Sequence, residues 1–159
     1  MAAEAMPEEP AERVRAVLER VLDELDIDGE VEIDEDEGEI VAAVEGDDDY
    51  GLLIGKRGQT IDALQLLCYQ AAYRGMKERK RVVVDAAGYR ERRRDSLQRR
   101  ADRAAEQAID LARPVELDAM SAPERRVVHE HHKERPEVET YSEGTEPHRC
   151  VVVAPLVSG

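Results

Sequence analysis

The tetrapeptide Gly55-Lys56-Arg57-Gly58 is the feature that most restricts what this 159-residue chain can fold into. Two glycines enclose two basic residues, between a short apolar segment and a helical pattern that starts near Thr60. Glycine has no Cβ, so the backbone there can turn sharply and can approach another backbone closely. Such a loop presents two positive charges on a backbone that another molecule can approach closely.

The segments around this loop predict a small mixed domain over residues 10–87. Apolar residues at helical spacing indicate helices, and alternating ones indicate strands. In chain order, the pattern predicts a helix over 11–25, a hairpin of strands 30–34 and 39–45, a short helix over 50–54, a helix from 60 to Gly75, and a strand over 82–84. Residues 1–9 are acidic and contain proline, so we expect them to be disordered.

A second small domain is predicted over residues 88–155, followed by a tail over 156–159. Ser121 and Glu124 have the spacing of a capping box, which marks the start of a helix. The predicted elements are a helix over 88–113 ended by Pro114, a helix over 121–133, and strands over 138–142 and 149–153. The chain is thus expected to be an α+β protein of two small domains.

The absence of Phe and Trp limits the size of each core, which must be built from Val, Leu, Ile and Ala. The two cysteines, Cys68 and Cys150, stand far apart in apolar segments, so we expect buried, unpaired thiols in a reducing cytoplasm. No segment approaches the roughly 18 apolar residues that span a bilayer, so no membrane insertion is expected.

The net charge of −14 is unevenly distributed along the chain. Residues 1–50 hold 3 basic and 20 acidic residues, residues 51–113 hold 15 and 8, and residues 114–159 hold 5 and 9. The middle third therefore carries a net charge of +7, and binding to phosphate needs positive surface of this kind. The acidic first third fits a solvated surface, a high-salt adaptation or a partner site equally well.

The loop does not fit a nucleotide hydrolase. A phosphate loop needs four residues between its first two glycines and a hydroxyl after its lysine. Only three residues separate Gly51 from Gly55, and Arg57 follows Lys56. The interpretation that remains is a G-x-x-G loop in which Lys56 and Arg57 contact phosphates beside a helix N-terminus. Ile54 would then line a groove for the bases. A plain turn whose glycines only relieve strain is the competing interpretation.

The segment 52–65, which reads LLIGKRGQTIDALQ, resembles the type II KH domain of the bacterial Jag family, also called KhpB. The second unit resembles the Arg-x-x-x-His (R-3-H) domain of that family. The resemblance covers about residues 10–155, and the further N-terminal module of the family has no counterpart in the sequence. It implies a three-stranded sheet with helices on one face in the first domain. It also implies RNA contacts along 54–59, which includes Gln59.

Arg125 and His129 supply the signature of the second domain. Because they stand four residues apart, they share one helical face. A solvated helix face is the usual meaning of this spacing, so the assignment of both residues to a nucleic-acid surface rests on the resemblance. The resemblance extends through 140–144 and 146–149, which makes Arg149 a further candidate.

No metal site is predicted. The motif H-E-x-x-H would need a histidine at position 133, which is Lys133, and neighbouring helical positions such as His131 and His132 point in different directions. No catalytic constellation is recognisable. The arginine-rich helix over 88–113 is interpreted as a self-neutralised solvent face, with Asp95 and Arg99 at ion-pair spacing.

These observations predict a cytoplasmic, non-catalytic, cofactor-free protein that binds single-stranded RNA through both domains. The resemblance implies an RNA chaperone or post-transcriptional regulator linked to cell-envelope growth. It also implies a second small KH-domain protein as partner. The sequence leaves both a homodimer and a heterodimer open. The alternative hypothesis is a scaffold whose acidic half docks a basic partner and which has little affinity for RNA.

Overall fold

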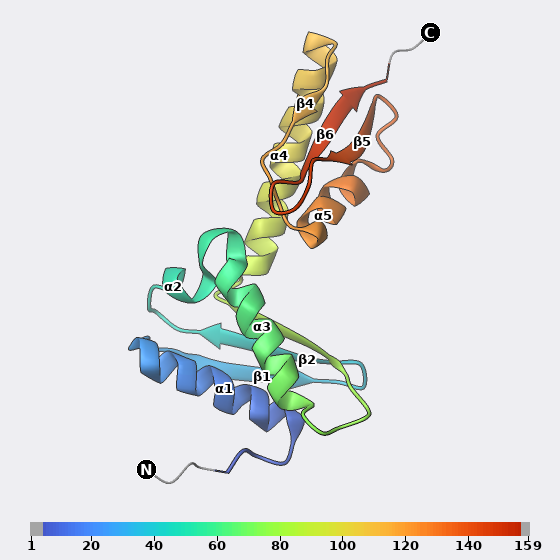
Figure 1. Cartoon of the computed structure of the whole chain (residues 1–159). Helices are drawn as coiled ribbons and strands as arrows, with labels where there is room; N and C mark the ends of the chain where they lie inside the picture. Colours follow the sequence, from blue (N-terminus) through green and yellow to red (C-terminus); the bar gives the residue numbers. More distant parts are fainter. Residues whose placement is uncertain (1–4, 157–159) are drawn as a thin grey trace. The chain divides into compact units, whose positions relative to one another are not determined.

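The computed structural model describes residues 5–156, and it divides the chain into two compact units, residues 1–90 and 91–159 (Figure 1). Each unit contains its own three-stranded sheet. Residues 1–4 of the predicted disordered segment and 157–159 of the predicted tail lie outside the described residues. The mixed α+β architecture with two small sheets confirms the predicted fold class.

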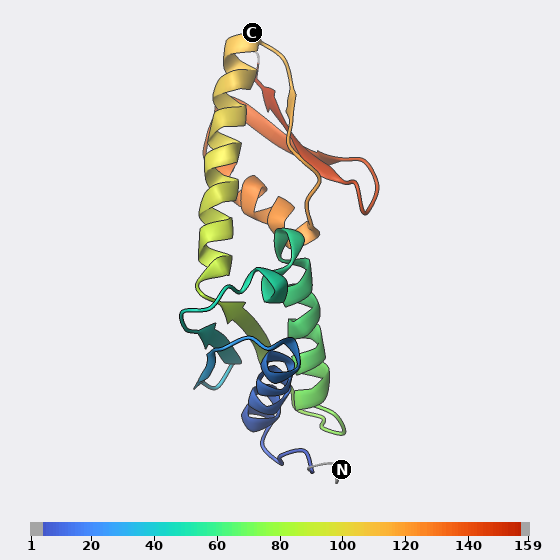
Figure 2. The same cartoon turned by 90° about the vertical axis from the view of Figure 1, so that its left-hand side faces the viewer.

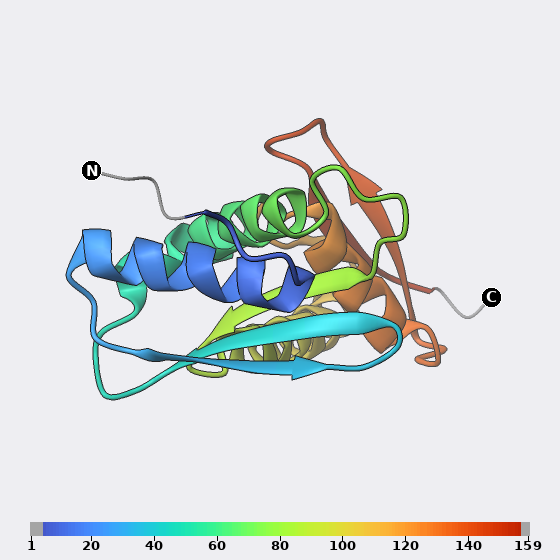
Figure 3. The same ribbon diagram turned by 90° about the horizontal axis from the view of Figure 1, so that it is seen from below.

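The first unit has the element order that the sequence predicts. Its elements are α1 (Pro10–Leu25), β1 (Glu30–Glu35), β2 (Glu39–Glu45), α2 (Gly51–Ile54), η1 (Lys56–Gly58), α3 (Gln59–Ala72) and β3 (Arg81–Ala86). Strand β2 is central, antiparallel to β1 and parallel to β3. Figure 3 shows α1 and α3 on the same side of this sheet, as expected.

The core of this unit lies between the two helices and one face of the sheet. Helix α1 buries Val14, Leu18 and Leu22, which are four residues apart and so share one face. Strand β2 buries alternate residues, Ile40 among them, because successive side chains of a strand point to opposite faces. Helix α3 contributes Ile61 and Cys68 to the same cluster. Aliphatic side chains thus make the core without Phe or Trp.

The second unit packs two helices against an antiparallel sheet. Its elements are α4 (Tyr89–Leu111, which begins in the first unit), β4 (Val115–Glu116), α5 (Ala122–His132), β5 (Val138–Glu143) and β6 (Cys150–Pro155), with strand order β4-β6-β5. In Figure 2 the yellow α4 runs beside the red strands. Ala104 and Ala105 of α4 pack against Val138 and Val153, because small residues let the helix approach the sheet closely. The capping box of Ser121 and Glu124 begins α5 as predicted.

Several details differ from the sequence prediction. The two-residue strand β4 was not predicted, because two residues cannot display a period. Helix α4 ends at Leu111 rather than near 113, since Ala112 adopts a left-handed conformation with φ 50°. Asp95 and Arg99 form no ion pair within residues 5–156. Instead, Arg100 lies 3.7 Å from Asp118, outside its own helix.

The two cysteines behave as expected for structural thiols. Both are free and buried. Burial raises the pKa of Cys68 to about 12 and that of Cys150 to about 11. Neither side chain is therefore available as a thiolate at neutral pH.

Replacing Leu18 by Ala is expected to destabilise the first unit by about 2–5 kcal/mol, because the side chain is fully buried and the change leaves a cavity. The matched control is Leu25→Ala in the same helix, which removes an exposed side chain and should cost far less. Hydrogen exchange followed by NMR should show faster exchange of amides in residues 10–90 and little change in 91–155. Equal acceleration in both units would contradict their division into separate cores.

Candidate nucleic-acid interface

The backbone of the Gly55–Gly58 loop adopts three conformations in close succession that are rare for residues with a side chain. Gly55 has φ 74°, Arg57 has φ 56° and Gly58 has φ 75°. Glycine adopts such angles without strain, whereas a residue with a Cβ does so at a cost. The loop therefore makes a tight reversal between α2 and α3, and only Arg57 carries a side chain in the left-handed region.

Both glycines are also needed for close packing. A Cβ on Gly55 would clash with Oγ1 of Thr60, and a Cβ on Gly58 would lie 2.7 Å from the ring of Tyr89. Both approaches are far closer than van der Waals contact, so any larger residue would push the loop away from the domain. The interpretation that the glycines only relieve strain is thus incomplete, because they also bring the loop tightly against α3 and Tyr89.

The side chains of the loop face solvent. Lys56, Arg57 and Gln59 are exposed, Gly58 is buried, and Ile54 is partly buried against the core. Lys56 forms no ion pair with any residue in 5–156. Beside them, Leu52 of α2 is 64% exposed, an apolar neighbour that the sequence analysis did not select.

Helix α3 begins directly at this loop, with Gly58 as its N-cap and no side-chain cap. Its first backbone N–H groups therefore add partial positive charge next to Lys56 and Arg57. Asp62, the acidic residue of the first turn, accepts a hydrogen bond from Arg90 Nη1 at 2.9 Å. This ion pair compensates the negative charge of the Asp62 carboxylate in the first turn of α3.

In the second unit, His129 is held by two hydroxyl groups of β5. Its Nδ1 lies 2.7 Å from Thr140 Oγ1, and its Nε2 lies 3.0 Å from Ser142 Oγ. Burial, and to a lesser extent the positive charge of Arg125, lowers the pKa of His129 below its ordinary value. A neutral imidazole suits this position, because one nitrogen can donate and the other accept while each hydroxyl does the opposite.

Arg125 was expected on the surface of the second unit, but it lies mostly inside that unit. It is only 8% exposed. Its Nη1 donates to Met120 O at 2.7 Å, and its Nη2 donates to Glu146 Oε1 at 2.6 Å. Helical spacing correctly places Arg125 on the same helix as His129, but it cannot indicate that a carbonyl and a carboxylate from other segments surround the guanidinium.

Arg149 is partly buried directly before β6, and its Nη1 donates to Gly144 O at 2.6 Å. It therefore braces the loop between β5 and β6. Thr140 and Ser142 are the residues of this surface that the sequence analysis missed. Their spacing of two on a strand, on the side of His129, was the available indication.

Comparison with known proteins agrees with this geometry. Residues 11–85 match the model of the KH domain of KhpA/KhpB, and residues 95–155 match the model of the R-3-H domain. Together the two matches contain both parts of the candidate interface. The chain belongs to the Jag/KhpB family.

Relatives in this family are named RNA-binding protein KhpB. The protein of Clostridium symbiosum is 38% identical over 139 residues, which are 86% of this chain and 62% of that relative. The relative in Lactiplantibacillus plantarum is 43% identical over 104 residues, or 65% of this chain and 32% of that protein. The relative in Bacillus subtilis is 35% identical over 109 residues, which are 65% of this chain and 50% of that protein. The chain thus spans between about a third and two thirds of these relatives.

The environment of His129 makes a prediction about pH. NMR titration of its ring should give a pKa below the ordinary value of about 6.5. As the pH falls, His129 is protonated in the unfolded chain before it is protonated in the folded one. Lowering the pH through about 6.5 and below should therefore reduce the free energy of unfolding. Replacing Thr140 by Val and Ser142 by Ala removes both hydroxyl partners of the ring, so the NMR signals of His129 should change more than those of the other three histidines. A ring pKa at or above about 6.5 in the natural chain would contradict the buried, hydroxyl-held geometry.

Proposed function

We propose that this KhpB-family chain binds single-stranded RNA without catalysis, and that the Gly55–Gly58 loop is its main contact with the RNA backbone. The observation that carries the proposal is the exposure of Lys56 and Arg57 on a backbone that glycine brings tightly against the start of α3. A polyanion at this position meets two cations and the N–H groups of a helix N-terminus together. The names of the relatives point to the same ligand.

Electrostatics should dominate this binding. Of the five tyrosines only Tyr141 is exposed, so side chains that could stack on bases are scarce. Leu52 and Ile54 offer apolar contact for bases beside the loop, but no aromatic platform. We therefore expect modest base preference and an affinity that falls steeply with salt.

In the R-3-H unit, we assign the RNA-facing role to His129 with the hydroxyls of Thr140 and Ser142, and a supporting role to Arg125 and Arg149. Both arginines donate hydrogen bonds within the protein. Arg125 donates to Met120 and Glu146, and Arg149 donates to Gly144. Two modest sites on one chain increase the overall affinity through effective concentration. The cytoplasmic location is a prediction that rests on the unpaired cysteines. A second small KH-domain partner and a role in cell-envelope growth are predictions that rest on the resemblance.

The competing proposal is a scaffold whose acidic half docks a basic partner. The docking surface in this proposal is strand β1, where the carboxylates of Glu30, Glu32 and Asp34 are exposed. Unlike the loop, this surface carries no positive charge, so it would not bind RNA. The two proposals therefore differ in whether the loop is required for binding to a nucleic acid.

Replacing Lys56 and Arg57 together by Asp should weaken binding of a short unstructured RNA by about 10- to 100-fold at low salt. It should also reduce the slope of log affinity against log salt by about 2, because two phosphate contacts are lost. Fluorescence anisotropy over a salt series measures both quantities. The folded state is checked by thermal unfolding.

The matched control is Arg74→Asp with Lys77→Asp, which makes the same change in charge. Both residues are exposed just beyond the other end of α3. If net charge alone governs binding, the control and the loop variant will lose the same affinity, and the loop assignment fails. If the natural chain shows no binding at any salt concentration, the scaffold is favoured.

A further inference from the structure

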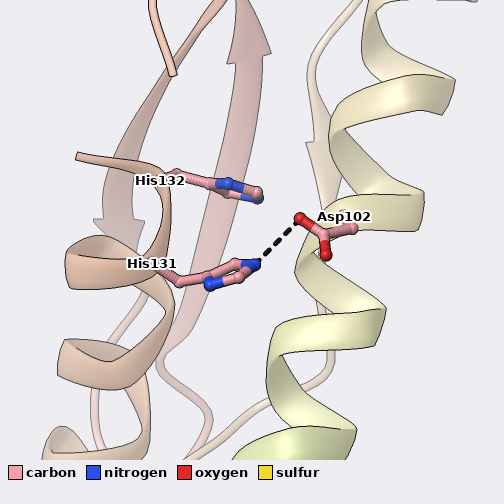
Figure 4. A group of neighbouring side chains, drawn as sticks. All are labelled: Asp102, His131 and His132. Atoms are coloured by element: carbon pink, nitrogen blue, oxygen red, sulfur yellow. Dashed lines mark hydrogen bonds and ion pairs between the residues drawn. The ribbon is translucent and has the colours of Figure 1, made fainter. Parts of the chain in front are cut away.

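Three potential metal ligands meet within the R-3-H unit, away from His129 and the hydroxyls of β5. Asp102 lies on α4, and His131 and His132 are the last two residues of α5. One ligand atom from each of the three lies within 4.8 Å of the others. Figure 4 shows both imidazole rings extending from the end of α5 toward the helix that carries Asp102.

The expectation that His131 and His132 point in different directions is wrong for this pair. Their ring centroids are 5.2 Å apart. The third group comes from α4, so no motif within α5 could reveal it. The motif H-E-x-x-H concerns a single helix, whereas the structure brings two helices together.

The contact between Asp102 and His131 has the chemistry of a cation site. His131 Nε2 lies 2.9 Å from Asp102 Oδ1, so the ring N–H donates a hydrogen bond to the carboxylate oxygen. A metal ion replaces such a proton and binds both atoms. The side chain of Asp102 is 47% exposed and that of His131 is 27% exposed, so an ion can reach them from solvent.

His132 is oriented by the backbone. It is buried, and its Nε2 donates to Ala101 O at 2.8 Å. Metal-binding histidines commonly hold one ring nitrogen in this way, which fixes the tautomer and leaves the lone pair on the other nitrogen. In the neutral ring of His132, Nδ1 is therefore the basic atom.

The positive charge of Arg135 disfavours binding of a cation at this group of side chains. Its Nη1 lies 3.7 Å from Asp102 Oδ1, and its Nε lies 3.8 Å from Glu137 Oε2. Because Glu137 offers a second carboxylate, the guanidinium can turn away when an ion arrives. Removing this positive charge should strengthen binding of a metal.

We propose that Asp102, His131 and His132 form a binding site for a divalent transition metal such as zinc, cobalt or nickel. Two imidazoles and one carboxylate favour these ions over magnesium or calcium, which prefer oxygen ligands alone. Bonds of about 2.1 Å place ligand atoms roughly 3.4 Å apart. The 2.9 Å contact between His131 and Asp102 must therefore open slightly, whereas a pair near the 4.8 Å limit must close by about 1.4 Å. The bound ion would link α4 to α5, the helix that also carries Arg125 and His129.

The test is titration of the full chain with cobalt(II) at neutral pH, followed by the visible absorption bands that protein ligands induce. We expect one equivalent to bind and zinc to displace it. Asp102→Asn and His131→Gln, both partly exposed positions, should each weaken binding by at least about tenfold. Arg135→Gln should strengthen it.

The control is His148→Gln, which removes an exposed histidine outside this group and should leave the cobalt affinity unchanged. NMR signals of the His131 and His132 rings should shift on addition of zinc, and a chelator should reverse the shift. Absence of induced absorption, or equal affinity in the natural chain, Asp102→Asn and His131→Gln, would overturn the site. RNA binding is not part of the readout, so failure here leaves the proposed function standing.

Discussion

The backbone between Gly55 and Gly58 is the constraint on which this account depends. Its positive φ angles and its contacts with Thr60 and Tyr89 exclude any side chain larger than hydrogen at the two glycines. Because the chain reverses there so tightly, Lys56 and Arg57 are displayed at the first turn of α3. The three-stranded sheet and the two helices that cover it serve as the rigid support of this loop.

Local charge, rather than net charge, decides what such a chain can bind. The overall charge is −14, yet the acidic residues are concentrated in the first 50 positions. Exposed charges separated by more than about 8–10 Å are largely screened at physiological salt. The pairing of Asp62 with Arg90 further compensates the one acidic residue in the first turn of α3. An acidic protein can therefore present a phosphate-binding loop.

Periodicity was sufficient to predict the main helices and strands, because burial alternates along β2 and recurs every four residues along α1, while the arrangement of the first sheet and its helices followed from the resemblance. The exposed loop could also be selected, since glycines and cations are local features. Tertiary neighbours were not predictable. The burial of Arg125 depends on Met120 and Glu146, and the group at Asp102 depends on how two helices meet. Spacing within one helix contains no information about residues that approach from elsewhere.

The most direct test of the central claim is to follow the backbone amide signals of the chain by NMR while a short unstructured RNA is added. The account predicts that the largest shifts fall on Gly55 to Gln59 and the first turn of α3, with smaller ones around His129. A duplex of the same length should shift them less. If the largest shifts fall instead on the acidic strand β1, or if the loop signals do not move at saturating RNA, the account is contradicted.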